Sequence, residues 1–127
     1  KKHIRVLGGQ QTRPNIHIDD ITDVYLFFLK NSNITGIFNA GFENLKIVEI
    51  AEMIKKYTDA EINIEQSNDP RSYRVSSAKL LEKGFIPKKN VSVAIKEIIA
   101  SFNNGTLKDD QSFYNLNWMQ KNIIGDK

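Results

Sequence analysis

The chain has 127 residues, of which 40% are hydrophobic and 26% charged, and its formal net charge is +3. This length suffices for one compact core and is too short for two full domains. The absence of cysteine excludes disulfides, thiolate zinc sites and cysteine nucleophiles. No apolar run approaches the roughly 20 residues that span a bilayer, and no apolar segment follows the basic N-terminus. We therefore expect a soluble, cytoplasmic protein with a single domain over residues 1–127.

Two short extended segments and a helix are predicted in the first 33 residues. Residues 4–7 favour a strand that ends at a Gly-Gly pair, and residues 15–18 favour a second extended piece. From residue 20 onward the apolar positions follow helical spacing, at Ile21, Val24, Tyr25, Phe28 and Leu29. We expect Asp19 or Asp20 to cap this helix, which ends near residues 31–33.

Further elements alternate along the rest of the chain. Residues 35–41 predict a buried strand, and residues 62–65 predict another after an intervening helix that Asn44 caps. The apolar positions of that helix are Ile47, Ile50, Ala51, Ile54 and Tyr57. A short helix begins at Ser76 or Ser77 and stops at Gly84.

The last predicted elements are helical. Pro87 delays the next helix until about Val91, and this helix then runs to residues 103–105, while residues 113–124 predict a final helix. The fold class is therefore α/β, a mixed subdomain of short strands and about five helices. Its strands are too few and too short for a large self-sufficient sheet.

Basic residues concentrate in the second half of the chain. Eight basic and two acidic residues lie between Arg71 and Lys108, a local excess of six positive charges. Such a region can face a phosphate group, a nucleic acid or only water. Two alternatives stay open: a small basic nucleic-acid-binding domain, although no RNA-module or helix-turn-helix pattern stands out, and a module that docks a separately encoded partner.

One segment, VLGGQQTRPNIHIDDI at residues 6–21, combines an apolar strand, a glycine turn, an arginine and a helix start. Pro14 disfavours helix at Arg13 and so holds this arginine in an extended segment. A guanidinium in that setting can donate two parallel hydrogen bonds to a phosphate. The competing interpretation is a surface salt bridge with Asp19, Asp20 or Asp23.

Two more segments follow in order, IFNAG at residues 37–41 and DPRSYRVSSAKLLEKGFIP at residues 69–87. Together the three segments resemble the substrate-binding half of NAD-dependent nucleotide-sugar epimerases and dehydratases, the extended short-chain dehydrogenase/reductase family. The first is similar to that family's V-x-G-x-G-x-Q-x-R pattern, the second to its Y-N-x-G strand, and the third to its second nucleotide-contacting loop.

The resemblance implies a function and a set of site residues. It implies the C-terminal, sugar-nucleotide-binding portion of an isomerase, lyase or reductase of polysaccharide biosynthesis, with a homodimer possible for the complete enzyme. Arg13 would contact the diphosphate, and the second loop would contribute Asp69, Arg71, Tyr73 and Arg74. The chain departs from the family at Gln66, where many relatives carry a nucleotide-binding arginine.

The cofactor-binding and catalytic motifs of that family are missing from this sequence. Its glycines do not have the spacing of a dinucleotide fingerprint, and none of its four tyrosines is followed four residues later by lysine. We therefore expect no catalytic residue and no cofactor in this chain, which would be inactive alone. NAD(P) and the catalytic groups would come from a missing N-terminal Rossmann half. His3 and His17 are too isolated for a metal site, and a surface or strand-facing role is expected for both.

Overall fold

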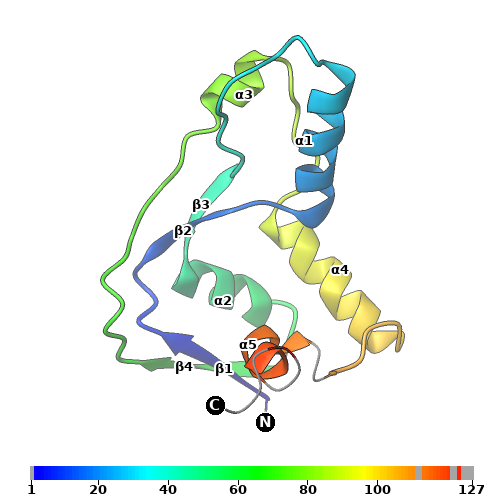
Figure 1. Cartoon of the computed structure of the whole chain (residues 1–127). Coiled ribbons are helices and arrows are strands. Elements are labelled where there is room, and N and C mark those ends of the chain that lie inside the picture. The colour runs from blue at the N-terminus through cyan, green and yellow to red at the C-terminus, as the bar shows by residue number, and fades with distance from the viewer. Residues whose placement is uncertain (1, 111–112, 121–122, 124–127) are drawn as a thin grey trace. The chain divides into compact units, whose positions relative to one another are not determined.

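The computed structural model describes residues 2–110, 113–120 and 123. Nine elements follow one another in this part of the chain: β1 (Lys2–Leu7), β2 (Thr12–Asn15), α1 (Ile18–Lys30), β3 (Glu43–Lys46), α2 (Ile47–Lys55), β4 (Ala60–Glu65), α3 (Ala78–Glu82), α4 (Val91–Asn103) and α5 (Asn115–Met119) (Figure 1). The mixed α/β class with about five helices is thus confirmed. The chain forms two compact units, Lys1–Glu97 and Ile98–Lys127, and the candidate site lies in the first.

The strands of the described residues form two separate two-stranded sheets. β1 runs parallel to β4, with Lys2 opposite Ala60, and β2 runs antiparallel to β3, with Thr12 opposite Lys46 (Figure 1). Two strands alone are only marginally stable in water, and α2 packs against both strands of the parallel pair. The expectation that these strands cannot build a large sheet is confirmed.

The second extended segment begins earlier than predicted, at Thr12 rather than at Asn15. The reason is the start of α1, because His17 is the N-cap residue and its Nδ1 accepts the backbone N–H of Asp19. Residues 16–18 therefore turn into the helix and cannot extend the strand. The predicted aspartate cap is corrected to His17, and Arg13 becomes part of β2 itself.

Residues 35–41 do not form the predicted strand. The backbone groups of Gly41 find a side-chain partner instead of a neighbouring strand, because the buried Ser77 hydroxyl accepts the N–H of Gly41 and donates to its carbonyl, both at 2.9 Å. The strand lies later, at β3. Asn44 is therefore a strand residue rather than a helix cap, and α2 instead begins after Lys46, whose N–H is accepted by Glu49 Oε2 at 2.6 Å.

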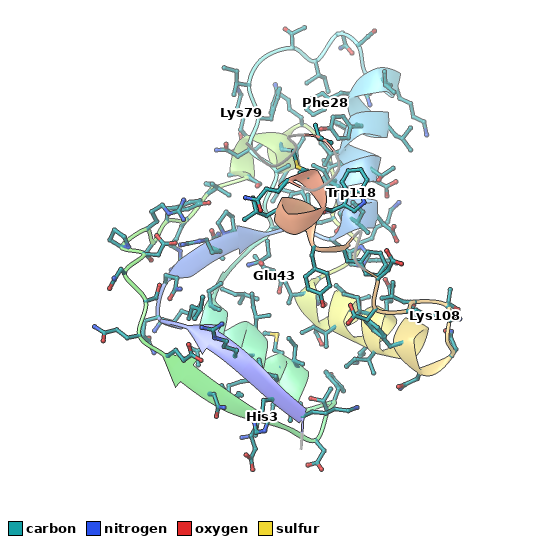
Figure 2. The ribbon with its side chains drawn as sticks, turned by 60° about the horizontal axis from the view of Figure 1, so that its bottom comes forward. His3, Phe28, Glu43, Lys79, Lys108 and Trp118 are labelled. Atoms are coloured by element: carbon teal, nitrogen blue, oxygen red, sulfur yellow. The ribbon has the colours of Figure 1, made fainter. Side chains whose placement is uncertain are left out.

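The main core of the first unit lies between α1, α3 and the segment just before β3. Its fully or nearly buried members are Val24, Leu80 and Phe85. Phe85 meets Phe27 edge-on with ring centroids 5.7 Å apart and stacks on Phe42 at 5.5 Å, arrangements that aromatic pairs favour. Figure 2 shows Phe28 on α1 and Lys79 on α3 at the same end of this unit.

The buried face of α1 is rotated relative to the predicted one. Tyr25 and Leu29, predicted to face the core, are 69% and 77% exposed, whereas Phe27 packs against it. The cause is Asp20, which is 1% exposed and whose two carboxylate oxygens accept the backbone N–H groups of Lys88 and Lys89 at 3.0 Å. This anchor turns the side of the helix that carries Asp20 inward.

The remaining helices agree more closely with the sequence. Ser77 precedes α3 but makes no side-chain cap, and the helix ends before Gly84, which has φ +95°. α4 begins at Val91 as predicted, and Glu43 Oε2 accepts its N–H at 2.6 Å. α5 forms part of the helix predicted over 113–124, of which 121, 122 and 124 lie outside the described residues. None of the helices in the described residues is long and apolar enough to cross a membrane.

Candidate functional site

Arg13 projects from β2 toward the segment that follows β4. Its Nη1 donates to the carbonyl oxygen of Thr12 at 3.0 Å and to the carbonyl oxygen of Arg71, and its Nη2 donates to Asp69 Oδ2 at 3.1 Å. The side chain is 21% exposed. Its ion pair is therefore with Asp69, from the predicted second loop, and not with the aspartates of α1 that the competing interpretation named.

Asp69 binds Arg71 as well as Arg13. Nε and Nη2 of Arg71 approach the two carboxylate oxygens at 2.7 and 2.9 Å, and the backbone N–H of Arg71 donates to Oδ1 at 3.1 Å. These bonds from Arg71, with the nearby Arg13, hold the pKa of Asp69 well below its usual range, and the carboxylate in turn raises the pKa of Arg71. Two guanidiniums and one carboxylate leave this group of side chains with one net positive charge.

Tyr73 completes the group. The Arg13 guanidinium carbon lies 5.3 Å from the centroid of the tyrosine ring, within cation–π range. The ring is half exposed. We call Arg13, Asp69, Arg71 and Tyr73 the Arg13 cluster. The exposed Arg74 makes no hydrogen bond or ion pair with the described residues, so the structure brings together four of the five predicted site residues.

Side chains that the sequence analysis did not assign to the site fix the loop that carries this cluster. The backbone N–H of Thr12 donates to Ser72 Oγ at 3.0 Å, and its carbonyl accepts from Tyr73 N at 3.3 Å. The amide of Asn44 binds both backbone groups of Val75, at 2.9 and 3.0 Å. The segment after β4 consequently runs alongside β2 and β3 before it reaches α3 (Figure 1).

A second polar cluster surrounds His17. This side chain is buried, so the predicted surface or strand-facing role is wrong. Because its Nδ1 accepts a backbone N–H, its Nε2 carries the proton and donates to Glu97 Oε2 at 2.9 Å. The partner is 80 residues away in the sequence, so no local pattern could have revealed the contact.

His17, Asp19 and Glu97 place potential metal ligands within 4.8 Å of one another. The Lys89 ammonium already lies between the two carboxylates, 2.7 Å from Asp19 Oδ2 and 2.6 Å from Glu97 Oε1. It lowers the pKa of both acids, and they raise the pKa of Lys89. Since both imidazole nitrogens are also engaged, this arrangement is an ion-pair network and offers a cation no free ligand set.

Acidic residues outside the basic region neutralise part of its charge. Lys88 pairs with Asp23 at 2.7 Å, in addition to the Lys89 and Arg71 pairs described above. Three carboxylates from outside the region, those of Asp19, Asp23 and Asp69, therefore offset half of the six excess positive charges counted along the sequence, which weakens the nucleic-acid alternative.

Comparisons with known proteins address the predicted resemblance. No protein-family model matches the chain. A stretch of 65 residues is 48% identical to ADP-L-glycero-D-manno-heptose-6-epimerase of Brachyspira hyodysenteriae, covering 48% of this chain and 20% of that protein. The chain thus spans about a fifth of the length of this curated relative.

Two solved structures share the fold. RMD from Pseudomonas aeruginosa, solved in complex with NADPH, matches with a TM-score of 0.68 and 20% identity over 80% of this chain and 36% of that one. DdhaC matches with a TM-score of 0.65 and 20% identity over 85% of this chain and 35% of that one. The sequence likeness to a nucleotide-sugar epimerase, together with this shared fold, confirms the resemblance to a portion of the epimerases of the extended short-chain dehydrogenase/reductase family.

Proposed function

We propose that the Arg13 cluster binds the diphosphate of a nucleotide sugar, and that this chain is the substrate-binding portion of an NAD(P)-dependent epimerase, dehydratase or reductase. The observation that carries the proposal is the meeting of two guanidiniums from distant segments around one carboxylate, with a net positive charge. The curated relative acts on an ADP-linked sugar according to its name. An ADP-linked sugar is therefore the first candidate substrate.

The unused donors of the cluster match a diphosphate. An arginine has five N–H donors, and Arg13 uses three, so that Nε–H and one Nη2 hydrogen have no partner among the described residues. Arg71 is 75% exposed, and its Nη1 group, which has no hydrogen bond with the described residues, can donate to a ligand while Nε and Nη2 stay on Asp69. Charge-assisted hydrogen bonds of this kind are about twice as strong as neutral ones. The role of the chain in the reaction is to orient the substrate.

The cofactor belongs to another part of the proposed enzyme. NAD(P) supplies hydride transfer when bound, but this chain contains no glycine fingerprint to hold its pyrophosphate. In this proposal a dinucleotide-binding half provides the cofactor and the catalytic groups, and these 127 residues neither bind NADH nor turn over a nucleotide sugar alone. Isomerase or lyase chemistry in cytoplasmic polysaccharide biosynthesis, by a dimeric enzyme, belongs to the same proposal.

The test is calorimetric titration of the full-length protein with ADP-, UDP- and GDP-glucose, and with adenosine as the control without phosphate. Arg13→Ala should weaken binding of the preferred nucleotide sugar about tenfold or more, because a hydrogen bond to a charged group contributes about 1.5–3 kcal/mol. Arg13→Lys should restore only part of the loss, since an ammonium cannot reproduce the planar fork.

Arg5→Ala is the matched control. Arg5 forms a similar fork with Glu65, at 2.9 and 2.7 Å, so that its loss removes one positive charge and one bidentate ion pair outside the cluster. Affinity in this variant should stay within about twofold of the parent. Failure to bind any of the three nucleotide sugars, or an equal loss in the Arg5 and Arg13 variants, would contradict the proposal.

A further inference from the structure

The carboxylate of Asp69 has no accepting capacity left for a ligand. An ionised carboxylate offers about four lone-pair sites. Oδ1 accepts from the backbone N–H and the Nε–H of Arg71, and Oδ2 accepts from Nη2 of Arg71 and Nη2 of Arg13. All four sites are therefore occupied, and each is occupied by an arginine.

A direct contact with substrate is accordingly a poor role for Asp69. Its charge repels phosphate, and a ribose hydroxyl finds no free lone pair on either oxygen. Its effect on Arg13 is more specific. With the carbonyls of Thr12 and Arg71, Asp69 supplies the third of three acceptors that fix the Arg13 guanidinium from separate directions. Asp69 is itself held, because its backbone N–H donates to Ser67 Oγ at 3.2 Å.

We infer that Asp69 is a positioning residue, which fixes the guanidinium of Arg13 so that its two unused N–H groups are presented to the diphosphate. This inference rests on the proposed function of the cluster. It revises the expectation that Asp69 itself contacts the substrate. An arginine whose plane is already fixed loses less freedom when it binds a ligand, so a fixed Arg13 binds diphosphate more tightly than a mobile one.

The charge of Asp69 weakens diphosphate binding, whereas its contact with Arg13 strengthens it. A substitution of Asp69 can therefore test the inference. Asp69→Asn raises the net charge of the cluster from +1 to +2, and Coulomb attraction alone would then tighten diphosphate binding. Loss of the charged acceptor frees Arg13 and weakens binding. The sign of the change in affinity therefore shows which effect dominates.

The experiment titrates the full-length protein with ADP and AMP. We expect Asp69→Asn to weaken ADP binding about fivefold or more and to reduce the preference for ADP over AMP, because Arg13 no longer meets the second phosphate in a fixed orientation. Asp69→Glu, which keeps the charge but displaces the carboxylate, should fall between this variant and the parent. ¹⁵N NMR of the Arg13 Nε–H group, assigned with Arg13→Lys, should show faster hydrogen exchange in Asp69→Asn.

Glu65→Gln is the matched control, since it adds the same charge at the Arg5 fork and should leave ADP affinity within about twofold. A parent protein that does not bind ADP would overturn the proposed function and this inference together. A parent that binds, with Asp69→Asn equally tight or tighter, would overturn the inference alone. If Asp69→Asn does not fold, Asp69→Glu decides by the same criterion, and an unchanged affinity in that variant refutes the positioning role.

Discussion

Replacement of the buried Asp20 should destabilise the first unit more than replacement of any exposed aspartate in it. Its carboxylate is 1% exposed, and each oxygen accepts one backbone N–H, from Lys88 and from Lys89, at 3.0 Å. A hydrogen bond to a charged group contributes about 1.5–3 kcal/mol, and Asp20→Ala removes two while leaving two N–H donors without an acceptor. We expect a loss of about 3–5 kcal/mol in the free energy of unfolding, a large part of the roughly 5–15 kcal/mol of a small domain.

Urea unfolding followed by far-UV circular dichroism measures this loss. With a denaturant dependence of about 1–3 kcal/mol per molar urea, the midpoint should fall by roughly 1–5 M. Asp20→Asn keeps the shape and one acceptor oxygen, so its effect should be about half as large. Asp23→Asn, which loses only the exposed ion pair with Lys88, should hardly move the midpoint. If the urea midpoint of Asp20→Ala equals that of Asp23→Asn, the buried hydrogen bonds of Asp20 do not stabilise the fold as argued.

Other substitutions test the core, the loop contact and the ion-pair network. Leu80→Ala removes a side chain with 0% exposure and should cost about 2–5 kcal/mol in the same unfolding assay; a loss below about 1 kcal/mol would contradict its place in the core. Gly41→Ala would place a Cβ 2.9 Å from the nearest side-chain atom and should cost about 1–3 kcal/mol, and an unchanged midpoint would show that the loop moves freely. The Lys89 ammonium lowers the pKa of Glu97, so this stabilisation is complete above the unfolded pKa of about 4.3 and is lost as the pH falls through the lower folded value. Lys89→Met should therefore reduce the difference between urea midpoints measured at about pH 6 and about pH 3, and an unchanged difference would contradict the coupling.

Local pattern was sufficient for much of the fold. Helical spacing of apolar residues located α1, α2 and α4, and the first and third family-like segments identified four residues that the fold brings together. Arg13 and Asp69 are 56 residues apart, so their ion pair could not be read from spacing. The resemblance assigned both residues to one ligand, but the sequence analysis named only Asp19, Asp20 and Asp23 as ion-pair partners of Arg13.

Three of the errors share one physical cause, which is a side chain that satisfies backbone groups across a long sequence separation. The Ser77 hydroxyl binds the backbone of Gly41, and the Asn44 amide binds the backbone of Val75, where a neighbouring strand would otherwise supply the hydrogen bonds. Asp20 rotates α1 through contacts 68 and 69 residues away. Residues of these types favour caps and turns in local statistics, so the sequence alone assigned them to caps.

A crystal structure of the full-length protein with a bound ADP-linked sugar would show whether the Arg13 cluster holds a diphosphate. We predict phosphate oxygens within hydrogen-bonding distance of the Arg13 guanidinium, with the Arg13–Asp69 contact retained. A bound nucleotide whose phosphates contact other residues, with Arg13 still turned only toward Asp69 and the two carbonyls, would show that the cluster does not bind the diphosphate.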